Sequence, residues 1–334
     1  MYENVTVLGA GVFGTAIATL LSNNGHKVKL WCYEKQVAQD IESHRENKIY
    51  LSGVKLDSNI TATDNLEEAI ADNKWVFQAI PVKFLRSILQ NVKNFVSDNQ
   101  IIVSLSKGIE QESFLLPTDI IKDVLGSKIK TAVMCGPNFA KEIVQKYYTA
   151  TTIAADDKSV AKDLALILSS SYFKTYLSDD IVGVQVGGAI KNVITLAVGM
   201  VNGSQNTIAF VLTRGLIEMA RLAKHFGGKS QTIYGLSGFG DLVLSSTGTF
   251  SRNLMAGKLL GERKSLDKVK VELRVLPEGI NTVQSIHQLI KKSDLQMPIC
   301  VAVYKTIFEQ GCFGDFLEDF MVQPLEVEDN EHCF

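Results

Sequence analysis

Hydrophobic residues form two kinds of pattern at the start of the chain, short continuous runs and a helical spacing. A short apolar run covers residues 5–8, and a glycine-rich turn covers residues 9–14. The next stretch, 15–23, has apolar residues at helical spacing and ends before Gly25, as helices often end beside a glycine. A second apolar run follows at 28–31. The spacing predicts a strand, a helix and a second strand, the βαβ unit of about 30 residues found in parallel sheets.

Apolar runs and helical patterns continue to alternate up to about residue 179. The later runs that we interpret as strands are 75–81, 100–108, the start of 130–143, 150–155 and 172–178, with a helix over 157–170. Alternation of this kind is typical of a mostly parallel sheet with helices on both faces. We therefore predict that residues 1–179 form a doubly wound, Rossmann-type α/β domain.

The pattern changes after that point, because strand signals fade and long helical patterns replace them. The predicted helices are 181–201, 205–226, 251–261, 279–292 and 298–310. We expect residues 180–334 to form an all-helical second domain that carries substrate and catalytic groups. Two domains also suit a chain of 334 residues, since domains commonly have roughly 100–200 residues.

The composition excludes several classes of function. The chain is 46% hydrophobic and 21% charged, with a net charge of −2, so it lacks the basic surface expected of a nucleic-acid binder. Polar residues interrupt each apolar run before the ~18–20 residues that cross a bilayer, and no basic leader precedes the first strand. The five cysteines are widely spaced, without a CxxC pair or a Cys/His cluster. We expect a cytoplasmic protein with no membrane insertion, no disulfide framework and no metal.

The glycine-rich turn has the GxGxxG spacing of a dinucleotide-binding fingerprint. Gly9 permits the tight turn, Gly11 lets the backbone approach a pyrophosphate, and Gly14 allows the helix to pack on the strand. The free N–H groups at the start of that helix favour phosphate. The alternative is a tight turn with no ligand, but the strand-turn-helix context favours a dinucleotide.

The end of the second strand leaves the choice between NADH and NADPH open. Trp31 stands where an acidic residue often holds the adenosine ribose of NAD, and Tyr33, Glu34 and Lys35 follow closely. Lys35 could attract the 2′-phosphate of NADP, whereas Glu34 argues against it. The sequence leans toward NADPH.

Two polar segments follow predicted strands at the edge where doubly wound sheets bind ligands. Lys107 follows one strand, and Gly136, Pro137 and Asn138 follow another. Each alone could be an ordinary loop. Their shared position at carboxyl ends of parallel strands favours a binding role.

Lys191 is the only charged residue between Ile181 and Thr213. An unpaired buried ammonium group is costly, so this lysine either extends to the surface or is held inside for chemistry. Gly187 and Gly188, one turn earlier, are expected to leave room for a substrate beside it. Enclosure lowers the pKa of a lysine and lets it exchange protons near neutral pH.

A second group of polar residues lies between 234 and 260. A glycine-rich turn leads to Asp241, which apolar residues follow, so we expect a partly buried carboxylate whose partner is Lys191. Ser251, Arg252 and Asn253 open a helix. A serine cap, free N–H groups and an arginine suit a phosphate, although an ordinary capped surface helix would look similar.

Taken together, the motifs resemble those of the bacterial, soluble NAD(P)-dependent glycerol-3-phosphate dehydrogenases over nearly the whole chain. The motifs are "GAGVFGTAIA", "SLSKGIE", "CGPNFAKEI", "GGAIKNVITLAVG", "TRGLIEM", "GLSGFGDLVLS", "SRN" and "PEG". The resemblance implies reversible reduction of dihydroxyacetone phosphate to sn-glycerol 3-phosphate with NADPH or NADH, without a metal. The product would supply phospholipid synthesis. Independently of the resemblance, the apolar character of the helical half leads us to expect a homodimer.

The resemblance also implies roles for individual residues. Lys191 resembles the catalytic acid/base. The implied substrate-binding residues are Lys107, Gly136, Asn138, Lys191, Asn192, Asp241, Ser251, Arg252 and Asn253. The implied cofactor contacts, beside Gly9, Gly11 and Gly14, are Val12, Phe13, Tyr33, Lys107, Ala140, Arg252, Leu276 and Glu278.

The chain departs from the family pattern at three of these places. Serine is usual at the position of Asn138, tryptophan or tyrosine at that of Phe13, and a basic residue near Tyr33. Two other functions stay open at this point. One is a related 3-hydroxyacid dehydrogenase that acts on a carboxylate, and the other is a non-catalytic protein that senses the cofactor.

Overall fold

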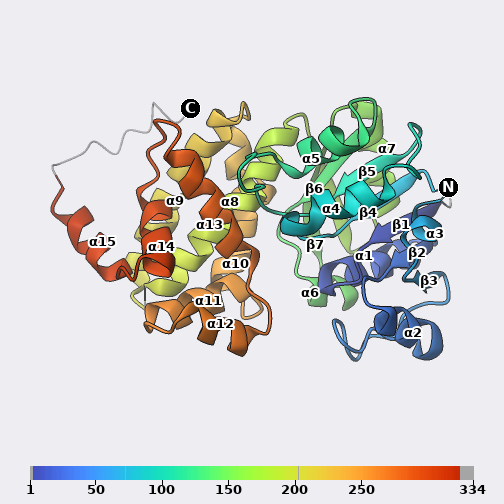
Figure 1. The fold of residues 1–334 in the computed structure, drawn as a ribbon, viewed down its shortest axis with the longest axis horizontal. Helices are drawn as coiled ribbons and strands as arrows, with labels where there is room; N and C mark the ends of the chain where they lie inside the picture. Colours follow the sequence, from blue (N-terminus) through green and yellow to red (C-terminus); the bar gives the residue numbers. More distant parts are fainter. Residues whose placement is uncertain (1–2, 72, 202, 324–334) are drawn as a thin grey trace. The chain divides into compact units, whose positions relative to one another are not determined.

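A computed structural model describes residues 3–71, 73–201 and 203–323 of the protein. The chain divides into two compact units (Figure 1). Unit 1 comprises Met1–Ser106 and Pro117–Ile181, and unit 2 comprises Lys107–Leu116 and Val182–Phe334. The short segment 107–116 therefore belongs to the second unit although strands precede and follow it in the sequence.

Unit 1 is built on one eight-stranded sheet in the order β3-β2-β1-β4-β5-β6-β7-β8. Neighbouring strands are parallel except β6 and β7, which are antiparallel. The strands are β1 Asn4–Leu8, β2 Lys27–Trp31, β3 Ile60–Thr63, β4 Trp75–Gln78, β5 Ile101–Ser104, β6 Lys130–Cys135, β7 Thr149–Ala155 and β8 Phe173–Ser178. The predicted doubly wound, mostly parallel sheet is confirmed. The edge strand β3 carried no clear signal in the sequence, because it is four residues long and only partly buried.

Helices cover the sheet, which explains the continuous apolar runs of its central strands. All four residues of β4 and of β5 are buried, as expected for strands covered on both faces. The helices of unit 1 are α1 Val12–Asn23, α2 Lys35–His44, α3 Leu66–Ile70, α4 Val82–Val92, α5 Pro117–Leu125, α6 Ala140–Val144 and α7 Lys158–Leu168. Among them, α1 packs with α6 and α7, and α4 packs with α3 and α5.

Unit 2 is helical in its described part. Its elements are α8 Ile181–Met200, α9 Gln205–His225, a 3-10 turn Ser230–Tyr234, a π turn Leu236–Gly240, α10 Asp241–Thr247, α11 Arg252–Gly261, α12 Leu266–Leu273, α13 Glu278–Ile290, α14 Pro298–Phe308 and α15 Phe313–Met321. The five predicted helices are confirmed to within two residues at each end. The sequence pattern did not predict α10, α12 and α15, which have at most nine residues each.

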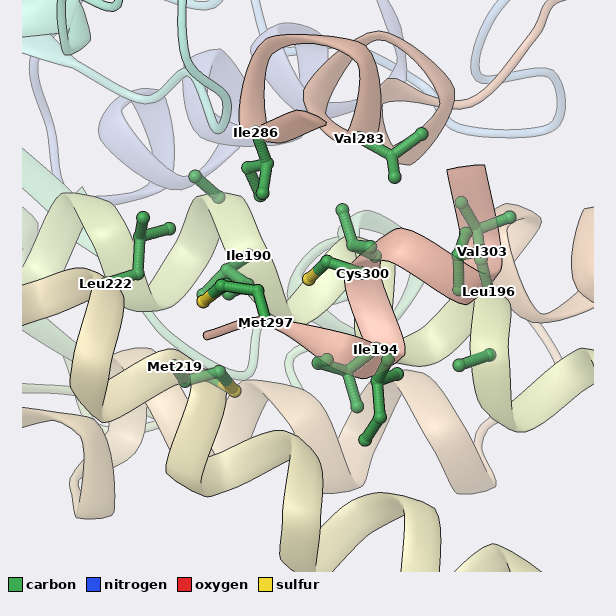
Figure 2. Packing of buried hydrophobic residues seen from close by; sticks show 14 of the residues in the cluster. Ile190, Ile194, Leu196, Met219, Leu222, Val283, Ile286, Met297, Cys300 and Val303 are labelled. Atoms are coloured by element: carbon green, nitrogen blue, oxygen red, sulfur yellow. The ribbon is translucent and has the colours of Figure 1, made fainter. Parts of the chain in front are cut away.

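The core of unit 2 surrounds α8. Figure 2 shows side chains from α9, α13 and α14 gathered around Ile190 and Ile194 of α8. Glycines let other helices approach this one closely. A Cβ atom on Gly199 would lie 2.7 Å from the Cα of Gly257 on α11, and one on Gly215 of α9 would lie 2.5 Å from Ile194. The backbone of α8 is therefore in direct contact with its neighbours, and its position is tightly fixed.

Burial also explains the apolar composition of α8. By length and mean hydropathy (1.6), this helix alone among the described ones could cross a membrane. However, 89% of that stretch is buried inside the protein. The burial is that of a core helix, which must be apolar on every side.

The segment 107–116 is fastened to α13. Ser285, which is fully buried, donates a hydrogen bond to the carbonyl oxygen of Ile109 at 2.8 Å. Gln111 donates to Gln284 at 2.8 Å. These bonds hold Lys107, at the start of the segment, within unit 2.

A buried carboxylate joins α9 to the beginning of α14. Glu218 accepts hydrogen bonds from the backbone N–H groups of Ile299 at 2.6 Å and Cys300 at 3.1 Å. It thereby satisfies two N–H groups that the first turn of a helix leaves without partners. Burial raises the pKa of Glu218 to about 7, against the opposing effect of these two N–H groups.

Glu218 should make the stability of the protein depend on pH. Because its folded-state pKa lies above its ordinary value, its favourable contribution is complete below about pH 4.5 and is lost as the pH rises through about 7. In Glu218→Gln, which cannot ionise, that dependence should vanish. We expect the free energy of unfolding of the wild type, relative to the variant, to fall by about 3 kcal/mol between pH 4.5 and pH 8.

Urea titrations at both pH values would measure this change. Glu262→Gln, which removes an exposed carboxylate from the same unit, is the matched control. Its free energy of unfolding relative to the wild type should be the same at both pH values. If the free energies of unfolding of the wild type and Glu218→Gln differ by the same amount at both pH values, Glu218 is not the source of the pH dependence.

Candidate functional site

Lys191 is held inside unit 2. Its side chain is 8% exposed, and its Nζ atom lies 3.0 Å from Oδ1 of Asp241. The ammonium group also donates a hydrogen bond to Oγ of Ser245 at 2.5 Å. The predicted pair with Asp241 therefore forms, and the alternative of a surface lysine is excluded.

Asp241 is shared by two lysines. Its side chain is 3% exposed, and its second oxygen, Oδ2, lies 2.5 Å from Nζ of Lys107. Each carboxylate oxygen thus faces one ammonium group. The three groups together carry one net positive formal charge, so the cluster suits an anionic ligand or a reaction that develops negative charge on oxygen.

The local sequence explains how the carboxylate reaches this position. Asp241 is the first residue of α10, where the helix dipole favours a negative charge. Ser245 lies four residues later, on the same face of the helix. The sequence interpretation missed Ser245, although the spacing of Asp241 and Ser245 within "DLVLS" offered a signal.

The interpretation of Gly187 as clearance for a substrate is wrong. A Cβ atom there would lie 3.1 Å from the carbonyl oxygen of Ser237 and 3.2 Å from the Cα of Gly238. The glycine instead lets the π turn 236–240 pack against α8. This contact fixes the turn that precedes Asp241, and so brings the carboxylate to Lys191.

A second polar group begins one residue further along α8. Asn253 donates a hydrogen bond to Oδ1 of Asn192 at 2.9 Å, and its own Oδ1 accepts one from the N–H of Gly279 at 3.1 Å. Ser251 caps α11, as predicted, by accepting a bond from the N–H of Leu254 at 3.3 Å. Arg252, between them, is exposed. The structure thus brings Asn253 of the predicted "SRN" motif beside Asn192.

The position after Glu278 admits only glycine. A Cβ atom on Gly279 would lie 2.5 Å from Oδ1 of Asn253 and 2.8 Å from the carbonyl oxygen of Asn192. The "PEG" motif therefore marks a close contact between the start of α13 and the asparagine pair. Leu276 and Glu278, which precede Gly279 in the sequence, are half-buried.

The glycines of unit 1 have the geometry expected of a phosphate-binding turn. Gly9 has a φ of +107°, which only glycine adopts readily. Gly11 has open space where a Cβ atom would stand, whereas a Cβ atom on Gly14 would collide with the carbonyl oxygen of Gly9. The open space lets a ligand approach the backbone at Gly11. Val12 and Phe13, which follow it, begin α1 and are at least partly exposed.

The remaining predicted residues of unit 1 lie after β2 and β6. Tyr33 is 76% exposed. Gly136 packs against Thr151, since a Cβ atom there would lie 3.0 Å from its Cα. Asn138 is buried and donates to Oγ1 of Thr151 at 3.0 Å, while its Oδ1 accepts no hydrogen bond within the described structure. Ala140 is the first residue of α6.

The site residues therefore form separate groups in the two units. Unit 2 brings together Lys107, Lys191 and Asp241, and separately Asn192 with Asn253. Unit 1 contains the glycine turn, Tyr33, Gly136, Asn138 and Ala140. Within the described residues, no group of three or more His, Cys, Asp or Glu side chains could hold a metal ion.

Comparisons with known proteins match both units. Residues 4–161 match the family model described as NAD-dependent glycerol-3-phosphate dehydrogenase N-terminus, and residues 180–318 match the C-terminus model of the same family. A glycerol-3-phosphate dehydrogenase [NAD(P)+] of Bacillus licheniformis is 38% identical, over 99% of this chain and 98% of its own. One of Citrifermentans bemidjiense is 36% identical over 98% and 99%.

A solved structure gives the same result for the fold. The crystal structure of glycerol-3-phosphate dehydrogenase from Coxiella burnetii superposes with a TM-score of 0.92 at 29% identity. The match covers 96% of this chain and 99% of that one.

Gly279→Ala should disturb the asparagine pair. The added methyl group would push α13 away from Asn253, and overpacking of this kind costs about 1–3 kcal/mol. We expect the midpoint of thermal unfolding to fall, as measured by circular dichroism. Gly314→Ala is a matched control on α15, because its Cβ atom would make only an ordinary contact of 3.4 Å. Equal midpoints for the two variants would refute the close contact.

Proposed function

Because this chain belongs to the NAD-dependent glycerol-3-phosphate dehydrogenase family, we propose that it reduces dihydroxyacetone phosphate to sn-glycerol 3-phosphate, reversibly, with NAD(P)H. The product would serve phospholipid synthesis in the cytoplasm, and the active form would be a homodimer. The observation that carries the proposal is the cluster of Lys107, Asp241 and Lys191, in which Asp241 and Lys191 are buried.

Unit 1, which we take as the cofactor-binding domain, would hold NAD(P)H. The open space at Gly11 fits a pyrophosphate, and the N–H groups at the start of α1 would bind its oxygens. When bound, the nicotinamide supplies the hydride. The further contacts assigned to the cofactor are Val12, Phe13, Tyr33 and Ala140 in unit 1, and Lys107, Arg252, Leu276 and Glu278 in unit 2.

Lys191 is the proposed general acid. As the carbonyl carbon gains a hydride, negative charge develops on the carbonyl oxygen, and the Lys191 ammonium group donates a proton to it. In the reverse direction the neutral amine takes the proton back. Asp241 keeps the lysine in place, and the bond to Ser245 restricts its orientation further. The positive charge of Lys107 would stabilise the developing alkoxide.

The phosphate end of the substrate is assigned to residues around the start of α11. Arg252 and Asn253, with the N–H groups of that helix, suit a phosphate dianion. Asn192 holds Asn253 by a hydrogen bond of 2.9 Å. The other residues assigned to the substrate are Gly136, Asn138 and Ser251. Binding at the phosphate positions the carbonyl group for reaction, although it lies away from the reacting carbon.

An absorbance assay at about 340 nm, the absorption band of the reduced nicotinamide, tests the proposal directly. Dihydroxyacetone phosphate should be reduced rapidly, and ketoacids that carry a carboxylate in place of the phosphate should not. Turnover of the carboxylate compounds alone would favour the related 3-hydroxyacid dehydrogenase instead. Binding of NAD(P)H without turnover of either substrate class would favour the cofactor-sensing protein.

Lys191→Ala should abolish most of the activity without affecting the cofactor. We expect kcat to fall by roughly 10²–10⁴-fold, the usual contribution of general acid–base catalysis, with the Kd for NAD(P)H unchanged. Lys270→Ala removes an exposed lysine of α12 in the same unit and should retain wild-type activity. Near-normal turnover in Lys191→Ala would remove this lysine from the mechanism.

A further inference from the structure

The segment after β2 lies where doubly wound dinucleotide-binding folds place the adenosine ribose. The N–H of Gly9 donates to the carbonyl oxygen of Trp31 at 3.1 Å, so the end of β2 adjoins the glycine turn. The N–H of Cys32 continues the pairing with β3 by donating to Thr63 at 2.9 Å. The pairing extends through Cys32, and Glu34 therefore stands only two residues beyond it.

The carboxylate of Glu34 is held in place from a distant part of the sequence. The hydroxyl group of Tyr50 donates a hydrogen bond to its Oε1 at 2.7 Å. This bond, more than burial, raises the pKa of Tyr50 to about 12. The phenol therefore stays protonated and keeps donating to Glu34 throughout the physiological pH range.

The same support reaches the glycine turn. The backbone N–H of Tyr50 donates to Oδ1 of Asn47 at 3.1 Å. Asn47 in turn donates to the carbonyl oxygen of Ala10 at 2.8 Å and to Oγ1 of Thr15 at 2.8 Å. Glu34 is thus connected by hydrogen bonds, through Tyr50 and Asn47, to the turn proposed to hold the pyrophosphate.

The carboxylates of Asp64 and Glu42 also contribute negative charge near the end of β2. Burial, followed by the negative charges of Glu34, Asp64 and Glu42 in that order, raises the pKa of the Cys32 thiol to about 12. All three carboxylates therefore lie close enough to oppose a negative charge at the end of β2. Carboxylates placed here would oppose the additional phosphate that distinguishes NADPH from NADH.

Two cations nearby have to be weighed against this field. Arg45 is turned toward backbone carbonyls, since its guanidinium group donates to Ile60 at 2.7 Å and to Asp57. Lys35 is exposed and begins α2. Lys35 is exposed, whereas Glu34 is anchored by the hydroxyl group of Tyr50.

We propose that Glu34, positioned by Tyr50, makes this chain prefer NADH to NADPH. The carboxylate of Glu34 would accept hydrogen bonds from the adenosine ribose hydroxyl groups of NADH, and it would repel the 2′-phosphate of NADPH. The inference rests on the proposed function, because it concerns the cofactor site of that same reaction. The proposed preference for NADH differs from the expectation drawn from the sequence alone, which favoured NADPH.

The test is a fluorescence titration of the full chain with NADH and with NADPH, in the absence of substrate. The ratio of the two Kd values isolates the 2′-phosphate, because every other group is common to both cofactors. We expect NADH to bind the wild type at least about tenfold more tightly, equivalent to about 1.4 kcal/mol. The preference should shrink as salt is added, since Glu34 is exposed and screened.

Variants assign the preference to individual residues. Glu34→Gln should tighten NADPH binding severalfold and bring the ratio of Kd values close to one. Tyr50→Phe should loosen NADH binding and reduce the ratio in part, because the carboxylate keeps its charge but loses its anchor. Asp163→Asn removes an exposed carboxylate of α7 in the same unit and should leave the ratio unchanged.

The outcomes separate this inference from the proposed function. If NADPH binds the wild type as tightly as NADH, or if Glu34→Gln leaves the ratio unchanged, the inference is overturned while the dehydrogenase assignment stands. If Lys35→Gln selectively weakens NADPH binding in a wild type that prefers NADPH, Lys35 determines the specificity and the inference fails. If neither cofactor binds, both the inference and the proposed function fail.

Discussion

The buried carboxylate of Asp241 between two lysines is the interaction on which unit 2 depends. Removing an ammonium group from water is costly unless an opposite charge compensates it, and here one carboxylate serves two such groups at 3.0 and 2.5 Å. Three separate parts of the chain must therefore converge: α8, the first turn of α10, and the segment 107–116. The remaining positive charge is what makes the cluster chemically useful.

The convergence requires backbones to approach more closely than side chains normally allow. Gly187 admits the turn before Asp241, Gly199 and Gly257 bring α8 and α11 together, and Gly279 brings α13 onto the asparagine pair. The same helix, α13, also holds the segment that carries Lys107 through Ser285. Packing of α8, α11 and α13 thus fixes both polar groups of unit 2 at once, so neither group depends on flexible loops alone.

In unit 1, too, residues that are distant in the sequence hold a local motif in place. The glycine turn is encoded within six residues, but Asn47 and Tyr50 hold it and Glu34 from a loop that follows α2. This support gives the end of β2 a defined charge. The family membership of the chain does not specify that charge, because its relatives are described as using either cofactor.

The sequence by itself determined the features that depend on neighbouring residues. Short apolar runs and period-3.6 patterns gave the positions of most strands and of the five long helices of unit 2. The glycine spacing gave the dinucleotide turn, and an isolated charge identified Lys191 as exceptional. Only the tertiary structure decided which distant groups meet. It assigned Lys107 to unit 2, added Ser245 to the cluster, turned Gly187 from expected open space into a packing contact, and placed Tyr50 on Glu34. Such contacts depend on how whole helices and loops pack, and the local pattern of residues does not specify that packing.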